Sequence, residues 1–196
     1  MFDGISGRYD FLNRLLSSGI DITWRNKLTK DLSEFPHDDI LDVATGTGDV
    51  AFALAKAFPA STVLGVDIAN EMLNVARKKS ESRKLNQRVS FKQEDAEALS
   101  FDSESFDAAT VAFGVRNFEN LEKGLKEINR VLKKRGVLMI LEFSIPRNIF
   151  VRFFYGLYFK YLVPFLGRIF SKDSDAYSYL YESVQEFPHG EEFATI

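Results

Sequence analysis

A chain of 196 residues is too short for a large multidomain enzyme, and its 45% hydrophobic and 27% charged residues are typical of one folded domain. The 25 lysines and arginines against 28 aspartates and glutamates give a net charge of -3, which argues against nucleic acid as a partner. Cysteine is absent and the two histidines, His37 and His189, lie far apart, so we expect no metal site. The N-terminus carries no signal-peptide pattern, and a cytoplasmic protein is expected.

The chain is predicted to form a single domain in three parts. Residues 1–35 show mixed helical periodicity and indicate an N-terminal helical arm of two short helices. Residues 36–143 alternate short β-branched runs with amphipathic stretches, the pattern of repeated βα units. Residues 144–196 are aromatic and basic at first and then polar, and are expected to form lid helices.

The middle part is predicted to contain five strands and three crossover helices. The strands are expected at Ile40–Val43, Val63–Asp67, Val89–Gln93, Ala108–Phe113 and Val137–Phe143, and the helices at Asp49–Phe58, Asn70–Arg83 and Leu121–Lys133. The last helix is expected to end at the run KKRG, which supplies cations and a left-handed glycine. Together these elements predict an α/β fold with an open, doubly wound, mostly parallel sheet.

The run LDVATGTGD, residues 41–49, joins the first predicted strand to the first helix. Glycines there let backbone N–H groups approach a ligand closely, although a tight turn without a ligand would also use them. As G-x-G-x-x-G/A, the run gives Gly46, Gly48 and Ala51, with Asp67 about twenty residues on, the pattern of a dinucleotide site for NAD. As D-x-G-x-G-x-G it begins at Asp42, as in the S-adenosylmethionine loop of class I methyltransferases.

That second pattern has one departure, because Ala44 stands where the first glycine is expected. Asp67, at the end of the second strand, suits the two hydroxyls of a ribose and fits either ligand. Asp95, just after the third strand, separates the two readings: its carboxylate suits the exocyclic amine of adenine, and the N–H of Ala96 suits a ring nitrogen. The three acids at successive strand ends favour S-adenosylmethionine, although an exposed loop aspartate is often only solvated.

Six segments resemble the quinone C-methyltransferases of menaquinone and ubiquinone biosynthesis, which are class I enzymes with a Rossmann-like fold. They are FDGISGRYDFLNRLLSSGIDITWR, LDVATGTGD, VDIANEML, EDAEALSFDSESFD, FGVRNFEN and LEFSIP. The glycine loop is generic to class I methyltransferases, whereas FGVRN and YDFLN are specific to this family. The resemblance covers essentially the whole chain.

The resemblance implies S-adenosylmethionine contacts at Thr47, Asp67, Asp95 and Ala96. The family has a serine directly before the FG box, where this sequence has Ala112, so that contact is expected through the backbone only. The resemblance also implies one more helix and a final pair of strands, which are missing from this sequence.

The acceptor implied by the resemblance is a ring carbon beside a hydroxyl of a reduced quinone, and this carbon becomes nucleophilic when the hydroxyl loses its proton. We expect Arg116 to lower the pKa of that hydroxyl and Asn117 to orient the ring. The alternative is an asparagine cap and a surface arginine at the start of the next helix. Tyr9 and His189 are the candidate general bases, although either residue type is more often a packing or surface residue.

Asp49 has two interpretations, as a partner for the ammonium group of the donor or as an acidic first-turn residue of its helix.

From Ser144 to Lys172 there is no acid, yet five cations alternate with aromatic residues. This pattern suits a helix on an anionic membrane surface or a cover over an isoprenoid tail. The longest charge-free apolar stretch is far too short to span a bilayer. A lid helix packed on the core, or on the second subunit of a homodimer, is the other interpretation.

The function predicted from the sequence is C-methylation of a polyprenyl quinol by S-adenosylmethionine, demethylmenaquinol to menaquinol first and a ubiquinone-pathway benzoquinol second. Two other classes stay open at this point. An NAD-dependent oxidoreductase would use the same Gly46 and Asp67, and a non-catalytic quinone or lipid carrier would need only the aromatic segment.

Overall fold

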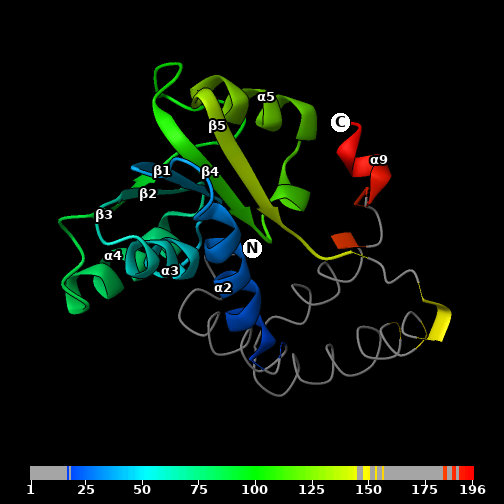
Figure 1. Cartoon of the computed structure of the whole chain (residues 1–196), viewed down its shortest axis with the longest axis horizontal. Helices are drawn as coiled ribbons and strands as arrows, with labels where there is room; N and C mark the ends of the chain where they lie inside the picture. The colour runs from blue at the N-terminus through cyan, green and yellow to red at the C-terminus, as the bar shows by residue number, and fades with distance from the viewer. Residues whose placement is uncertain are drawn as a thin grey trace. The chain divides into compact units, whose positions relative to one another are not determined.

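The computed structural model of the chain describes residues 17, 19–144, 148–150, 153, 156, 183–184, 187–188 and 190–196. Residues Ile20 to Glu142 form one compact unit, which contains the whole described sheet (Figure 1). The described residues after Glu142 belong to a second unit, where the short helix α9, Glu191–Ala194, lies near the C-terminus. Most of the predicted arm and lid lies outside the described residues, so the division into three parts stays a prediction.

The sheet of the first unit is fully parallel and confirms the predicted α/β class. Its strands are β1 (Asp39–Val43), β2 (Thr62–Asp67), β3 (Val89–Gln93), β4 (Phe106–Ala112) and β5 (Leu132–Leu141). They lie in the order β3-β2-β1-β4-β5, so the direction of winding reverses between β1 and β4. Ligands of such sheets bind at the carboxyl ends of the strands beside this reversal.

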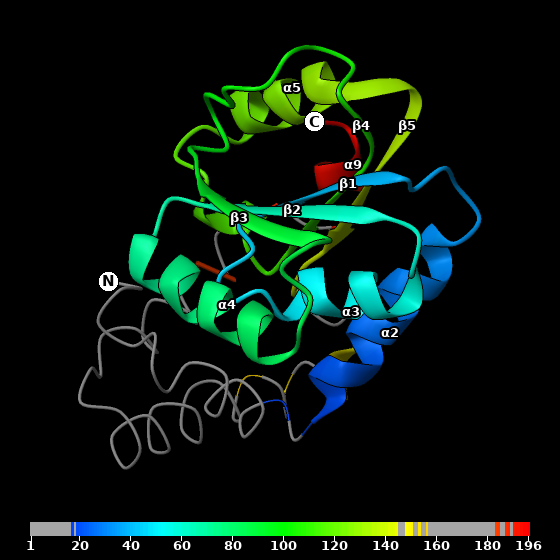
Figure 2. The same cartoon turned by 90° about the vertical axis from the view of Figure 1, so that its left-hand side faces the viewer.

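Four helices pack against the sheet: α2 (Ile20–Leu32), α3 (Asp49–Ala57), α4 (Asn70–Ser82) and α5 (Leu121–Val131). Helices α2, α3 and α4 cover one face, and α5 covers the other (Figure 2). Covered on both faces, β1 and β4 are mostly apolar, and Ile40, Leu41, Ala108 and Ala109 are all at most 1% exposed. Within the described part of the chain, no helix has the length and apolar character required to cross a bilayer.

The predicted helix end at KKRG is wrong. Helix α5 ends at Val131, and the run lies inside β5, next to a register shift against β4. Arg135, rather than the glycine after it, has the positive φ, 68°. Lys133 Nζ donates to a carboxylate oxygen of Asp107 at 3.0 Å, which joins β5 to β4. The cations that resemble a helix stop therefore lie on β5, where Lys133 links this strand to β4.

Ala44 stands at the first glycine position of the loop pattern, and the FG box has a glycine where the alanine side chain needs space. Ala44 has a φ of 53°, the left-handed conformation that favours glycine. Its side chain packs against Gly114, where an added Cβ would lie 2.4 Å from the Ala44 Cβ. Gly114 itself has a φ of -118°, which any residue adopts. The glycine of the FG box is therefore required by packing and not by backbone conformation.

We expect Gly114→Ala to lower the free energy of unfolding by about 2 kcal/mol, because two Cβ atoms cannot occupy this space without backbone shifts. The double variant Gly114→Ala, Ala44→Gly removes the opposing Cβ and should recover most of that loss. Urea unfolding of the three proteins measures both effects. A double variant as unstable as the single one would contradict the contact.

Candidate active site

The loop between β1 and α3 is fastened to the end of β2. The Gly46 N–H donates to Asp67 Oδ2 at 2.8 Å, and the Ala69 N–H donates to the other oxygen, Oδ1, at 2.9 Å. Gly46 has a φ of 56°, and a Cβ added there would meet no atom of the described residues within 4 Å. The glycine-loop backbone and a half-buried carboxylate therefore meet at the carboxyl ends of β1 and β2.

The carboxylate of Asp42 is turned into the fold and is 1% exposed. Its Oδ2 accepts from Thr45 Oγ1 and its Oδ1 from Thr110 Oγ1, both at 2.6 Å. Burial raises the pKa of Asp42 to about 6, although both hydroxyl hydrogen bonds oppose this shift. Both oxygens thus join β1, the loop and β4, and their contacts serve the shape of the loop.

This raised pKa gives a pH dependence with a definite sign. Between about pH 4 and pH 6 the folded protein holds a proton on Asp42 that the unfolded chain releases, so this group makes stability fall as pH rises. A shift of about two pH units corresponds to about 3 kcal/mol. We therefore expect Asp42→Asn, which keeps hydrogen-bonding capacity toward both hydroxyls, to gain in stability relative to wild type by up to this amount from pH 4 to pH 7.

Urea unfolding of both proteins across that range measures the difference, and other titrating groups cancel because both proteins carry them. Equal pH dependence of stability in the two proteins would contradict the raised pKa of Asp42.

Gly48 and Thr47 complete the loop. Gly48 is buried with a φ of 84°, and a Cβ there would lie 2.8 Å from the ring of Phe91 and 2.9 Å from that of Phe52. Thr47 is 3% exposed, and its carbonyl oxygen accepts from Lys79 Nζ at 3.1 Å. Gly48 thus packs against β3 and α3, and Thr47 is hydrogen-bonded to α4.

Asp49 is the first residue of α3 and lies between two cations. Its Oδ1 is 3.0 Å from Lys79 Nζ, and its Oδ2 is 3.6 Å from a guanidinium nitrogen of Arg25. These contacts match the acidic first-turn interpretation, because the negative charge lies at the helix N-terminus and is balanced within the protein.

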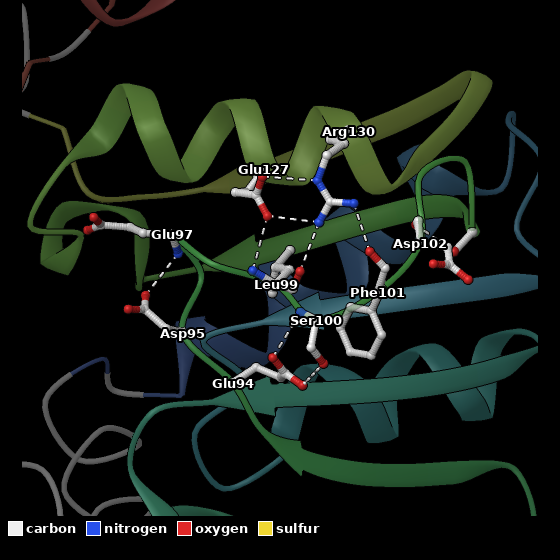
Figure 3. A network of polar contacts seen from close by, with 10 residues as sticks. Glu94, Asp95, Glu97, Leu99, Ser100, Phe101, Asp102, Glu127 and Arg130 are labelled. Atoms are coloured by element: carbon white, nitrogen blue, oxygen red, sulfur yellow. Dashed lines mark hydrogen bonds and ion pairs between the residues drawn. The ribbon is translucent and has the colours of Figure 1, made fainter.

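Asp95 and Ala96 follow β3 in a loop that reaches the end of β2. The Glu94 N–H donates to the backbone oxygen of Asp67 at 3.1 Å, which joins the two strand ends. Asp95 is exposed, and its Oδ1 accepts from the Glu97 N–H at 2.8 Å (Figure 3). Ala96 is half-buried. The predicted adenine contacts therefore lie next to the predicted ribose contact.

The FGVRN box begins directly after β4, whose last residue is the half-buried Ala112. Arg116 and Asn117 lie in a single 3-10 turn, η2, Val115–Asn117. Helix α5 is capped by Asn120, whose side chain accepts from the Lys123 N–H. The alternative of an asparagine cap at Asn117 is therefore wrong.

Arg116 is not a surface residue. Its Nη1 lies 2.6 Å from Glu142 Oε1 and 2.6 Å from the carbonyl oxygen of Phe113, and the two charged side chains are 7% and 6% exposed. Phe113 has a φ of 57°, and its N–H donates to Leu141 at 2.7 Å. Its ring centroid is 5.9 Å from that of Trp24 on α2. The box is thus held in a strained backbone conformation by α2, β5 and a buried ion pair.

Sequence reasoning missed three of these partners. Thr110 and Lys79 carry no local signal, since each contacts the loop from another element. Glu142 stands in the LEFSIP segment at the end of the last described strand, and an acid at a strand end was the available signal. The candidate bases Tyr9 and His189 lie outside the described residues.

The polar groups at this edge fit the hydroxyls and the base of a nucleoside. The Asp67 carboxylate suits hydroxyl donors, the exposed Asp95 suits an amine, and no described residue lies within 4 Å of a Cβ placed on Gly46. A doubly wound parallel sheet with this loop at its switch point is the arrangement of class I methyltransferases, the S-adenosylmethionine-dependent class, and it is shared with dinucleotide-binding proteins. The family model of the ubiE/COQ5 methyltransferase family matches residues 1–196, and the chain belongs to this family.

Two relatives and one solved structure illustrate the similarity. A demethylmenaquinone methyltransferase from Bacteroides fragilis is 46% identical over 97% of this chain and 78% of its own length. The ubiquinone/menaquinone biosynthesis C-methyltransferase UbiE of Geotalea uraniireducens is 47% identical over all of this chain and 83% of its own. A SAM-dependent methyltransferase from Aquifex aeolicus shares the fold at 23% identity, with a TM-score of 0.55 over 68% of this chain and 77% of that one.

Proposed function

We propose that this methyltransferase adds a methyl group to a ring carbon of a reduced polyprenyl quinone, converting demethylmenaquinol to menaquinol. The observation that carries the proposal is the match over residues 1–196 to a family whose similar members bear the name of this reaction. The fused naphthoquinol ring is preferred to a benzoquinol because the Bacteroides relative is named for demethylmenaquinone alone.

Donor binding is assigned to the carboxyl edge of the sheet. Asp67 accepts from the ribose hydroxyls, Asp95 accepts from the adenine amine, and the N–H of Ala96 meets a ring nitrogen. Gly46 and Thr47 present the loop backbone, and Ala112 contributes through its backbone. S-adenosylmethionine supplies an activated methyl group on a sulfonium, so the residues mainly have to align the reacting atoms and exclude water.

Asp42 and Gly48 support the donor indirectly. Asp42 holds Thr45 and Thr110, and Gly48 lets the loop pack against two phenylalanine rings. Their replacement should therefore change the affinity for the donor through the conformation of the loop.

Acceptor activation is assigned to the FGVRN box. Loss of the hydroxyl proton makes the neighbouring ring carbon nucleophilic, and the positive charge of Arg116 favours the resulting phenolate. Glu142 holds the guanidinium in place and also balances part of its charge. Asn117 orients the ring by hydrogen bonding, and Tyr9 or His189 accepts the hydroxyl proton.

Transfer of a labelled methyl group from S-adenosylmethionine to demethylmenaquinol in detergent micelles tests the function. A benzoquinol acceptor of the same prenyl length tests the choice of ring, and we expect the naphthoquinol to be methylated faster. Calorimetric titrations with S-adenosylhomocysteine and with NADH test the class. Tight binding of NADH without binding of the homocysteine nucleoside would contradict the proposal.

The polyprenyl tail implies contact with a membrane surface. Ile149, Phe150 and Phe153 are 74%, 74% and 63% exposed, and the surrounding sequence carries five cations without an acid. We expect sedimentation with anionic liposomes at low salt and weaker association at high salt. Phe150→Ser should reduce association at either salt concentration. A protein that stays in the supernatant under both conditions would contradict the membrane contact.

A further inference from the structure

Two side chains of α5 bind the backbone of the loop between β3 and β4. Arg130 donates from Nη1 to the carbonyl oxygen of Phe101 at 2.7 Å and from Nη2 to that of Leu99 at 2.8 Å. Glu127 Oε2 accepts from the Leu99 N–H at 3.1 Å (Figure 3). Three backbone groups of one irregular segment are therefore satisfied by two residues on neighbouring positions of a helix face.

Glu127 and Arg130 also bind each other. Arg130 Nε donates to Glu127 Oε1 at 3.0 Å and Nη2 donates to Oε2 at 2.8 Å, a two-pronged pairing that fixes the planes of both groups. The hydrogen bond from Arg130 lowers the pKa of Glu127, so the pair is charged at neutral pH. The guanidinium is thus already oriented toward the two carbonyl oxygens.

The other end of the loop is bound to the start of the same helix. Glu97 Oε1 accepts from the N–H of Asn120 at 2.7 Å, and the Glu97 N–H donates to Asp95 Oδ1. The Ala98 N–H also donates to the backbone oxygen of Asp95 at 3.0 Å. The segment from Asp95 to Phe101 is therefore held to α5 and its cap at Glu97, Leu99 and Phe101, and Asp95 is tied to it through Glu97 and Ala98.

We propose that Glu127 and Arg130 are positioning residues for adenine recognition: by fixing the loop after Asp95, they place the Asp95 carboxylate and the Ala96 N–H against the base of the donor. This inference rests on the proposed function, in which these two groups read the exocyclic amine and a ring nitrogen. Neither residue touches the donor, so their replacement acts on base selectivity and not on the methyl transfer itself.

Selectivity between adenine and hypoxanthine measures this role. S-inosylhomocysteine has an oxygen in place of the amine and a hydrogen on the ring nitrogen, so it opposes both Asp95 and Ala96. In calorimetric titrations, we expect wild type to bind S-adenosylhomocysteine at least about 10-fold more tightly than S-inosylhomocysteine, because hypoxanthine leaves the polar groups of Asp95 and Ala96 unpaired. Arg130→Gln should reduce this ratio of the two affinities at least threefold.

Lys126→Gln is the matched control, since Lys126 lies on α5 and contacts Glu122 on the exposed face. It should keep the wild-type ratio. Arg130→Lys retains the charge beside Glu127 but cannot span both carbonyl oxygens, so its ratio should lie between those of wild type and Arg130→Gln. If Arg130→Gln folds poorly, the lysine variant alone should still show a reduced ratio. In an Asp95→Ala background, Arg130→Gln should reduce the ratio by a smaller factor than in the wild-type background, because only the Ala96 N–H then remains to distinguish the two bases.

Two results would overturn the inference while leaving the proposed function intact. One is an unchanged affinity ratio in both folded Arg130 variants. The other is a reduction of the ratio by Arg130→Gln that is as large in the Asp95→Ala background as in the wild-type background. A wild-type protein that binds neither nucleoside would contradict the proposed function and the inference together.

Discussion

Asp67→Asn is expected to weaken the binding of S-adenosylhomocysteine about 100-fold. The carboxylate at the end of β2 accepts from the N–H groups of Gly46 and Ala69, and in the proposed complex it also accepts from two ribose hydroxyls. An amide offers only one oxygen and adds two hydrogens, so it cannot serve these donors together. Each charge-assisted hydrogen bond contributes about 1.5–3 kcal/mol, and a 100-fold factor corresponds to about 2.7 kcal/mol, the net loss of about one such bond.

Calorimetric titration measures this effect, and Asp39→Asn is the matched control. Asp39 begins β1 at the opposite edge of the sheet, where it contacts Lys133 and Thr62. Its replacement should leave the affinity within about twofold. An Asp67→Asn protein that binds the nucleoside as tightly as wild type would remove the ribose assignment.

Arg116→Ala is expected to lower kcat with demethylmenaquinol about 100- to 1000-fold, the usual cost of losing a group that stabilises a developing oxyanion. The dissociation constant of S-adenosylhomocysteine should change less than about threefold, since Arg116 is assigned to the acceptor. The measurement is steady-state methyl transfer beside calorimetric titration of the donor product.

The buried partner of Arg116 complicates this variant and also supplies its control. Arg116→Ala leaves Glu142 as an uncompensated buried charge, which costs about 3–5 kcal/mol of stability. The double variant Arg116→Ala, Glu142→Ala removes both charges and should recover stability but not turnover. If the double variant recovers turnover as well, Arg116 serves only to neutralise Glu142, and its role toward the quinol hydroxyl is wrong.

The fold was largely predictable because its signals are local. Short runs rich in branched apolar residues, such as Ile40–Val43, stand out as strands by themselves, and the amphipathic stretches between them repeat at helical spacing. The error at KKRG has a local cause too, because a helix stop and the start of an edge strand both use cations beside a glycine. The lysine there is committed to Asp107, a partner on another strand.

The sequence alone also determined which edge of the sheet carries the acids. In a parallel sheet the carboxyl ends of all strands lie on one side, so the strands predicted at Val63–Asp67 and Val89–Gln93 place the residues that follow them at a common edge. The junction of Asp67 with Glu94 agrees with that rule.

Only the tertiary structure decided what each of these groups contacts. Asp42 meets Thr110 across 68 positions, Arg116 meets Glu142 across 26, and Arg130 meets Leu99 across 31. Such pairings depend on how strands and helices are brought together, and no spacing within a single element encodes them. The periodicity of a chain fixes which face or edge a residue occupies, whereas its charge, pKa and orientation are set by neighbours that arrive from elsewhere in the fold.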